Sequence, residues 1–205
     1  MICKVCNGDK NEFFLNDFFY VNKHNICYKC FSDLIVIKEK NRIGNYECYS
    51  LYEYSGKIKD LIFQFKGLKD YELKDIFLEF FLEELNFKYK GYIVTFAPSY
   101  YLDDKERGFN HVEAMFSNLK NIKIPLFTKK TNYKQSNQKY IDRKNISKVI
   151  ELDKTKLIGI NKVLIVDDVL TSGNTLKTCA ELLTKAGITN IKLLTISKSS
   201  NFKRI

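Results

Sequence analysis

The stretch that decides the fold is residues 163–176, which read VLIVDDVLTSGNTL. Its first four residues are all apolar, which predicts a strand buried on both faces, as in a parallel sheet. Two acids, Asp167 and Asp168, follow where we expect the strand to end, and a small polar turn then leads into an apolar-periodic helix that ends near Gly187. We therefore predict an α/β fold that binds a ligand at the carboxyl end of this strand.

The turn at residues 171–175 has the composition of a phosphate-binding loop. Gly173 lets the backbone approach a ligand closely, Thr171, Ser172 and Thr175 add hydroxyl donors, and the helix start offers free N–H groups. The two preceding acids cannot serve the same phosphate, because like charges repel. We expect them to accept hydrogen bonds from sugar hydroxyls or to hold a hydrated Mg²⁺. The alternative is an ordinary strand–turn–helix with a polar turn.

Length and composition favour one main domain with a small appendage. The 205 residues are 45% hydrophobic and 14% aromatic, which is enough for a packed core. No run of 18 apolar residues occurs, and the N-terminus lacks the apolar stretch of a signal peptide, so we expect a cytoplasmic protein without a membrane span. The net charge of +10 favours polyanionic partners such as nucleic acid or pyrophosphate compounds. A solvated, lysine-rich surface is the alternative.

Four cysteines near the N-terminus have the spacing of a zinc ribbon. Cys3 and Cys6 form one C-x-x-C pair, and Cys27 and Cys30 form a second about twenty residues later. Four thiolates would make a closed, structural zinc site, whereas four unconnected buried thiols are the alternative. We expect the ribbon, followed by a basic, polar linker at 38–45, to occupy residues 1–45 and the main domain to occupy 46–205.

The middle of the chain supplies the rest of the expected core. Apolar periodicity predicts helices over 56–66 and 71–87, and strands over 92–99 and 122–127. Arg107 precedes a glycine and a further helix start, where it could bind an anion, although an arginine at such a place is commonly just exposed to solvent.

Residues 128–148 form a long basic interval with only one acid and with interleaved tyrosines. Such a segment between core strands is usually disordered or a functional loop, and cations with tyrosines could also bind single-stranded nucleic acid. A flexible loop without a partner is the alternative. The candidate nucleic-acid contacts are Lys129, Lys130, Lys134, Lys139 and Arg143.

These features, taken in order, resemble the ComF (competence protein F) family, often described as amidophosphoribosyltransferase-like. The shared features are the four-cysteine ribbon, a Tyr-x-Tyr-Ser-Gly…Phe-Lys segment (52–66), a strand into a proline loop (92–99), Arg-Gly-Phe-Asn (107–110) and the stretch 163–176. The last resembles the phosphoribosyl pyrophosphate (PRPP) motif of type I phosphoribosyltransferases. The chain departs from the family by Phe-Ala-Pro where Pro-Val-Pro is usual, and by His111 where glutamine is usual.

The resemblance implies a type I phosphoribosyltransferase-like fold, with a mostly parallel sheet flanked by helices. It implies Mg²⁺-dependent PRPP binding, in which Asp167 and Asp168 hold the ribose and Arg107 stabilises the departing charge. It also implies a part in natural transformation, with single-stranded DNA and a DNA-uptake helicase as partners. In the alternative, a non-catalytic nucleic-acid-binding or helicase-docking protein keeps the PRPP site as a sensor or vestige. No nucleophile is evident, so catalysis stays open. Besides the two acids, the implied PRPP-binding residues are Thr171, Ser172, Gly173, Asn174 and Thr175 around the 5-phosphate, and Ala97, Pro98 and Ser99 on the pyrophosphate side.

Overall fold

The computed structural model describes residues 2–10, 24–129 and 149–202. Its centre is a five-stranded sheet in the order β1-β2-β7-β6-β3, in which only the β1–β2 pair is antiparallel. The predicted α/β fold with a mostly parallel sheet is thus confirmed. The strands of this sheet are β1 (Val36–Ile43), β2 (Tyr46–Glu53), β3 (Ile93–Phe96), β6 (Lys162–Leu170) and β7 (Asn190–Lys198), and a separate antiparallel pair is β4 (Phe127–Lys129) and β5 (Ile150–Leu152).

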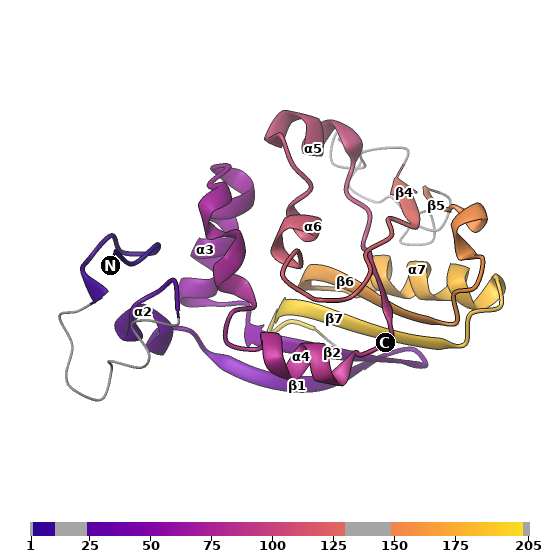
Figure 1. Ribbon diagram of the computed structural model, residues 1–205, viewed down its shortest axis with the longest axis horizontal. Helices are drawn as coiled ribbons and strands as arrows, with labels where there is room; N and C mark the ends of the chain where they lie inside the picture. Colours follow the sequence, from indigo (N-terminus) through magenta and orange to yellow (C-terminus); the bar gives the residue numbers. More distant parts are fainter. Residues whose placement is uncertain (1, 11–23, 130–148, 203–205) are drawn as a thin grey trace.

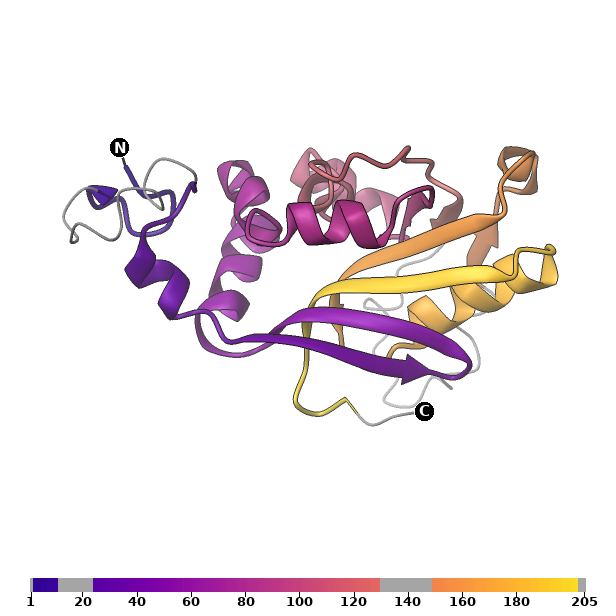
Figure 2. The ribbon, with the colours of Figure 1, turned by 60° about the horizontal axis from the view of Figure 1, so that its bottom comes forward.

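Helices cover both faces of the sheet, with α4 on one side and α7 on the other (Figure 2). The core accordingly has two hydrophobic clusters, one including α3, η3, α4 and α6, the other including α7. Along β6, Leu164 and Val166 belong to the first cluster and Val163 and Ile165 to the second, as the alternation of side chains in a strand requires. The helices are α2 (Tyr28–Ser32), α3 (Gly56–Gly67), α4 (Leu82–Lys88), α5 (Tyr101–Arg107), α6 (His111–Met115) and α7 (Asn174–Lys185), with the 3₁₀ helices η3 (Tyr71–Phe77) and η6 (Lys154–Leu157).

Strand β6 is longer than its apolar run predicts. Asp167 and Asp168 lie inside it, because its pairing with β7 continues to Leu170. Its pairing with β3, however, ends at Val166. The two acids therefore sit where one edge of β6 is no longer covered by a neighbouring strand, at the carboxyl end of the sheet.

Residues 38–45, which we expected to be a polar linker, are instead most of β1 and its turn into β2. Lys38, Lys40 and Arg42 are exposed, while Asn41 and Ile43 are buried. The sequence of this strand is polar because the strand lies at the edge of the sheet and its charged side chains are exposed to solvent. The division of the chain into domains at 1–45 and 46–205 stays a prediction.

Two other expected elements differ from the structure. The helix expected over 71–87 is divided into η3 and α4, because residues 76–78 are buried consecutively and a single amphipathic stripe cannot do that. The strand expected over 122–127 is an extended segment that exchanges two backbone hydrogen bonds of 2.9 Å with Val94.

The end of α7 follows the sequence prediction. Gly187 has φ +93°, and the N–H groups of Gly187 and Ile188 donate to the carbonyls of Thr184 and Leu183, both at 3.0 Å. This left-handed glycine closes the last turn of the helix and directs the chain into β7.

The N-terminal segment lies beyond α3, at the end of the molecule far from α7 (Figure 1). Cys3, Ile26, Cys27 and Cys30 are buried and belong to the first hydrophobic cluster, so this segment packs against the main core. Among the described residues, no helix is long and apolar enough to cross a bilayer.

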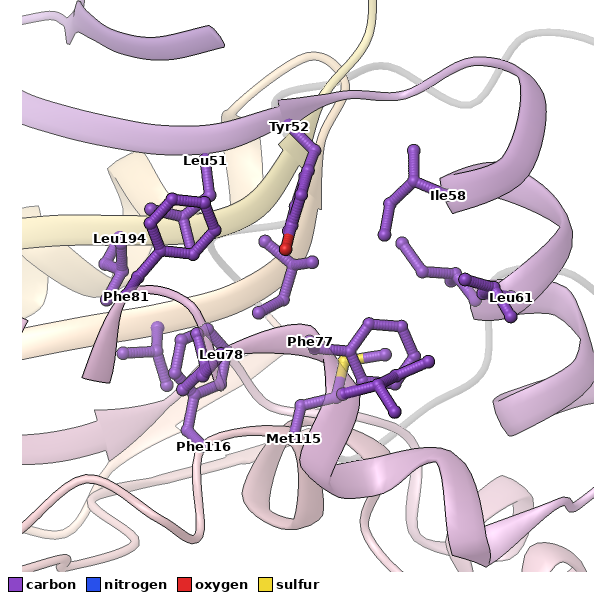
Figure 3. Close-up of a cluster of buried hydrophobic side chains, with 14 of the residues drawn as sticks. Leu51, Tyr52, Ile58, Leu61, Phe77, Leu78, Phe81, Met115, Phe116 and Leu194 are labelled. Atoms are coloured by element: carbon purple, nitrogen blue, oxygen red, sulfur yellow. The ribbon is translucent and has the colours of Figure 1, made fainter. Parts of the chain in front are cut away.

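Tyr52 offers a test of this core. Its side chain projects from β2 into the first cluster, near Phe81 and Phe77 (Figure 3), and its ring lies 5.3 Å from that of Phe81. The buried hydroxyl has no hydrogen-bond partner among the described residues. Because an unsatisfied buried hydroxyl is destabilising, we expect Tyr52→Phe to raise the free energy of unfolding by about 1 kcal/mol.

The matched control is Tyr49→Phe on the same strand, since the Tyr49 hydroxyl donates to Glu84 at 2.8 Å. Urea denaturation should show the Tyr49 variant less stable than the wild type and the Tyr52 variant at least as stable. A clear loss of stability in Tyr52→Phe would show that its hydroxyl does have a partner.

Candidate functional site

The loop at residues 171–175 joins β6 to α7. Gly173 is the N-cap of α7 with φ +71° and has no side chain to cap the helix, while the first N–H of the helix, that of Asn174, donates to Ser172 Oγ at 3.4 Å. A Cβ at position 173 would lie 3.1 Å from the Ile43 side chain, so glycine is required both by backbone conformation and by space. Thr171 and Ser172 are exposed. The first-turn N–H groups of α7 and these hydroxyls together suit a phosphate.

The two acids before this loop face opposite sides of the sheet. Asp168 contacts residues of α3 and α6, on the side of the first hydrophobic cluster. Asp167 lies on the α7 side, near the buried thiol of Cys179, whose pKa is raised by burial and, to a smaller extent, by the charge of Asp167. Asp167 is therefore on the same side of β6 as the helix that follows the loop.

Asp168 is held by several donors. Lys66 Nζ lies 2.6 Å and His111 Nε2 3.4 Å from its Oδ2, while the Val169 N–H donates to Oδ1 at 2.7 Å. Burial alone would raise the pKa of Asp168, but the hydrogen bond from His111 and the charge of Lys66 outweigh it and leave this pKa well below its usual range. In return, Asp168 outweighs the effect of burial on Lys66 and raises the pKa of that lysine.

Asp167 is in a different electrostatic environment. Its Oδ1 accepts the N–H of Asp168 at 2.9 Å. Burial and the neighbouring charge of Asp168 raise the pKa of Asp167 well above its usual value. A hydrogen-bond donor or cation supplied by a ligand would stabilise the ionised form of Asp167. Carboxyl groups with a strongly perturbed pKa are typical of functional sites.

Arg107 contacts both residues whose side chains lie against Asp168. Its Nε donates to the carbonyl of Lys66 at 3.0 Å, and its Nη1 lies 2.9 Å from Asp104 Oδ1 and 3.2 Å from His111 Nδ1. The side chain is only 12% exposed. The structure thus places Arg107 behind Lys66 and His111, and its contact with an anion stays a prediction.

The loop at 97–99 is anchored to the same part of the fold. The Ala97 N–H donates to the carbonyl of Val166 at 2.8 Å, directly before the acids. Asn110 Nδ2 donates to Ser99 Oγ at 3.0 Å and to Asp104 Oδ2 at 2.9 Å, and Ser99 donates to the same carboxylate. These bonds hold the loop against the start of α6.

A pocket of about 480 Å³ opens beside this loop. The structure thus brings Ala97, Pro98 and Ser99 together with Lys129 at the end of β4, whereas the two acids lie outside its lining. The other candidate nucleic-acid contacts, Lys130, Lys134, Lys139 and Arg143, lie outside the described residues. The pocket is lined by Phe96, Ala97, Pro98, Ser99, Tyr101, Asp104, Asn110, Glu113, Pro125, Phe127, Thr128 and Lys129.

The four N-terminal cysteines form a second candidate site, as their spacing predicts. The sulfur atoms of Cys3, Cys6, Cys27 and Cys30 all lie within 4.8 Å of one another. Backbone N–H groups donate to two of them, including Cys27 N–H to Cys3 Sγ at 3.2 Å. Burial raises the pKa of Cys3, but three such N–H groups outweigh it and lower this pKa to about 7. Four converging thiols supported in this way fit a tetrahedral zinc ion.

Lys66 and His111 are the residues that sequence reasoning missed. Lys66 follows Ile62 by four positions, so it lies on the same face of α3 as the buried residues. A lysine on a buried helix face indicates that an acidic side chain lies nearby. In the sequence, His111 stands out only because the ComF family usually has glutamine there. Neither the position of Lys66 on its helix nor this departure at His111 identifies Asp168 as the partner.

Comparison with known proteins finds a similar domain in the second half of the chain. Residues 105–201 match the phosphoribosyl transferase domain, which includes β6, the loop and α7. The competence protein ComFC of Streptococcus pneumoniae (strain ATCC BAA-255 / R6) is 27% identical over 150 residues, which are 72% of this chain and 66% of that protein. The match thus spans slightly less than two thirds of the relative.

Solved phosphoribosyltransferases show a weaker likeness. A hypoxanthine phosphoribosyltransferase from Staphylococcus aureus is 16% identical, with 72% of this chain and 68% of that chain covered and a TM-score of 0.36. A purine phosphoribosyltransferase from Pyrococcus horikoshii Ot3 is 17% identical, with 72% and 77% covered and a TM-score of 0.35. The chain is thus similar to ComFC and matches the phosphoribosyl transferase domain over residues 105–201, and the resemblance to the ComF family is confirmed.

Proposed function

We propose that the chain binds PRPP, with Mg²⁺, at the carboxyl ends of β3 and β6. The observation that carries the proposal is the loop at 171–175, where a helix start with a glycine N-cap and two exposed hydroxyls adjoin a carboxylate of raised pKa. A sugar phosphate has the matching groups, since its phosphate suits the helix start and its hydroxyls can donate to the carboxylate. The matched phosphoribosyl transferase domain supports the same ligand.

Each part of PRPP has a place in this proposal. The 5-phosphate lies against the first turn of α7, and Asp167 accepts the ribose hydroxyls. The pyrophosphate extends toward the pocket beside Ala97–Ser99, where Lys129 supplies positive charge. Mg²⁺ would neutralise the pyrophosphate, and Asp167 offers it the hard oxygen ligand that this ion prefers. If pyrophosphate leaves, the reaction is a phosphoribosyl transfer, in which this chain orients the ribose.

Gly173→Ala tests the phosphate loop. The added methyl group meets Ile43 and is strained at positive φ, so we expect the loop to shift and PRPP affinity to fall at least tenfold, about 1.4 kcal/mol, by calorimetric titration. The matched control is Gly187→Ala at the other end of α7, where φ is also positive but no atom lies within 4 Å. Both variants carry backbone strain, yet only Gly173→Ala should lose affinity. Equal affinities in the two variants would place the phosphate elsewhere.

We also propose that the chain handles single-stranded DNA in natural transformation, with a DNA-uptake helicase as a possible partner class. Support comes from the name of the competence relative and from the net charge of +10. A short labelled single strand should bind with an affinity that falls steeply with salt. Neutralising four lysines should reduce the salt slope by about 3. The lysines to replace by glutamine are Lys129, Lys130, Lys134 and Lys139.

The control for this experiment has the same net charge but keeps the basic interval. It replaces four lysines that are exposed elsewhere. Equal binding by the two quadruple variants would show that the interval 128–148 does not contact DNA. The control positions are Lys120, Lys154, Lys162 and Lys185.

A further inference from the structure

His111 is a buried histidine that meets a cation on one side and an anion on the other. It begins α6 four positions after Arg107, and the turn between them is made by Gly108, with φ +88°, and by Asn110, the N-cap of α6. Its Nδ1 lies 3.2 Å from Arg107 Nη1, and its Nε2 lies 3.4 Å from Asp168 Oδ2. The imidazole thus stands between a guanidinium and a carboxylate and meets each with a different ring nitrogen.

These two contacts decide which ring nitrogen carries the proton. A guanidinium can only donate hydrogen bonds, so Nδ1 must accept from Arg107 through its lone pair. An ionised carboxylate can only accept, so Nε2 must carry the hydrogen that faces Asp168. The neutral tautomer with its proton on Nε2 therefore satisfies both neighbours. The other neutral tautomer would place N–H against N–H and lone pair against lone pair, and a charged imidazolium would place an N–H against the guanidinium.

Arg107 is held in place for its contact with the histidine. Its Nη1 also lies 2.9 Å from Asp104 Oδ1, while its Nε donates to the carbonyl of Lys66 at 3.0 Å. A chain of contacts therefore runs from Asp104 in α5, through Arg107 and His111, to Asp168 in β6. Because hydrogen bonds in a chain polarise one another, the guanidinium makes the Nε2–H of His111 a better donor to the carboxylate.

The same contacts fix the orientation of the Asp168 carboxylate. Lys66 Nζ and His111 Nε2 both lie against Oδ2, at 2.6 and 3.4 Å, and the Val169 N–H donates to Oδ1 at 2.7 Å. A carboxylate oxygen has about two acceptor positions, so Oδ2 is occupied from two sides while Oδ1 keeps one position. A ribose hydroxyl can donate to that position. The 3.4 Å contact is long, as contacts in an unliganded site often are before a ligand tightens them.

We propose that His111 is a positioning residue that acts through Asp168: as the neutral tautomer protonated on Nε2, it links Arg107 to Asp168 and holds that carboxylate with Oδ1 able to accept a ribose hydroxyl of PRPP. The inference rests on the proposed PRPP function and adds how the second acid of the pair is held for its contact with the ribose. Arg107 then supports the ribose side of the site through His111.

The test compares two substitutions of similar length. The side chain introduced by His111→Gln can accept from Arg107 with its oxygen and donate to Asp168 with its nitrogen, whereas the one introduced by His111→Met has no N–H to donate. In calorimetric titrations of PRPP with Mg²⁺, we expect His111→Met to bind at least about tenfold more weakly than wild type and His111→Gln to bind within about threefold. A ring needed only for packing would give equal losses in both variants, because neither replaces it.

Nitrogen-15 NMR of the imidazole tests the tautomer directly in the ligand-free wild-type protein. The signals of His111 are identified by their absence from the spectrum of His111→Gln. At neutral pH we expect a proton on Nε2 and none on Nδ1. A role in packing alone would not require this tautomer, so the spectrum separates the proposed link from a merely structural role.

Each outcome decides the inference. A proton on Nδ1 overturns the link to Arg107. Equal losses of affinity in His111→Gln and His111→Met, or wild-type affinity in both, overturn the positioning role. Should His111→Met not fold, a loss of about tenfold or more in His111→Gln overturns the inference, and near wild-type binding by that variant with the expected tautomer supports it. A wild type that binds no PRPP overturns the proposed function and the positioning role together, while the NMR spectrum still shows whether the histidine links Arg107 to Asp168.

Discussion

Asp167→Asn should abolish most PRPP affinity, by at least about 100-fold, while leaving the protein as stable as wild type or more so at neutral pH. The side chain keeps its size but loses the charge that strengthens hydrogen bonds from the ribose hydroxyls, and such charge-assisted bonds contribute about 1.5–3 kcal/mol each. Stability should not suffer, because burial and Asp168 raise the pKa of Asp167, so its ionised form is disfavoured in the folded protein.

The pH dependence of stability should change with it. A carboxyl whose pKa is raised on folding stabilises the protein at low pH, below the unfolded value of about 3.9, and this contribution is lost as pH rises through the folded pKa. Asparagine does not titrate and therefore does not lose this contribution. At pH values above the folded pKa of Asp167, the free energy of unfolding of Asp167→Asn should therefore increase relative to that of wild type. Asp168 acts in the opposite direction: its lowered pKa stabilises the protein above about 3.9, and this contribution is lost as pH falls.

Calorimetry with PRPP and denaturation curves at pH 3.5–8 would measure both effects. Asp60→Asn, at an exposed position of α3, removes the same charge away from the site and should bind PRPP as wild type does. Unchanged affinity in Asp167→Asn would show that this acid does not meet the ribose, and a large loss of stability would show that its charge has a partner in the fold. Replacing Asp167 and Asp168 at once would remove the proposed contact of Asp167 with the ribose and also the ion pair between Lys66 and Asp168, so the two effects could not be separated.

The central elements of the fold could be predicted because their signals are local. In α3, Ile58, Leu61, Ile62 and Phe65 recur at helical spacing, and all four are buried. In β6 the apolar run is buried on both faces, and the glycine of the following turn has the positive φ that its residue type permits. The phosphate loop and the cysteine cluster are likewise encoded in short stretches or at fixed spacings.

The surroundings of Asp168 could not be predicted in the same way. Lys66 is 102 positions from Asp168 in sequence, so their contact depends on how α3 packs against the sheet. His111 reaches the same carboxylate from α6. A pattern within one segment cannot state which of several lysines meets which acid. The edge strand β1 could not be predicted for a different reason. Its exposed charged residues obscure the alternation of apolar and polar residues that marks a half-buried strand.

The second large effect is expected at the cysteine cluster. We propose that the freshly purified protein holds one zinc ion per chain, and that Cys27→Ser loses it. Cys27 Sγ lies 3.8 Å from Cys6 Sγ, and its backbone N–H donates to Cys3 Sγ, so its loss removes one ligand and disturbs the others. Structural zinc contributes apparent binding free energies of about 10–16 kcal/mol in small zinc domains. We therefore expect the N-terminal segment to unfold without zinc.

The matched control is Cys48→Ser, since Cys48 is fully buried in the second hydrophobic cluster and is not one of the four clustered thiols. Elemental analysis should find about one zinc in wild type and in Cys48→Ser, and none in Cys27→Ser. Hydrogen exchange should show lost protection in residues 2–10 and 24–34 of the Cys27 variant. The cysteines belong to the first hydrophobic cluster, whereas Gly173 of the phosphate loop lies against Ile43 of the second, so PRPP should still bind. Wild-type protein without stoichiometric zinc would leave the four thiols as ordinary buried cysteines, held together by packing against the first hydrophobic cluster alone.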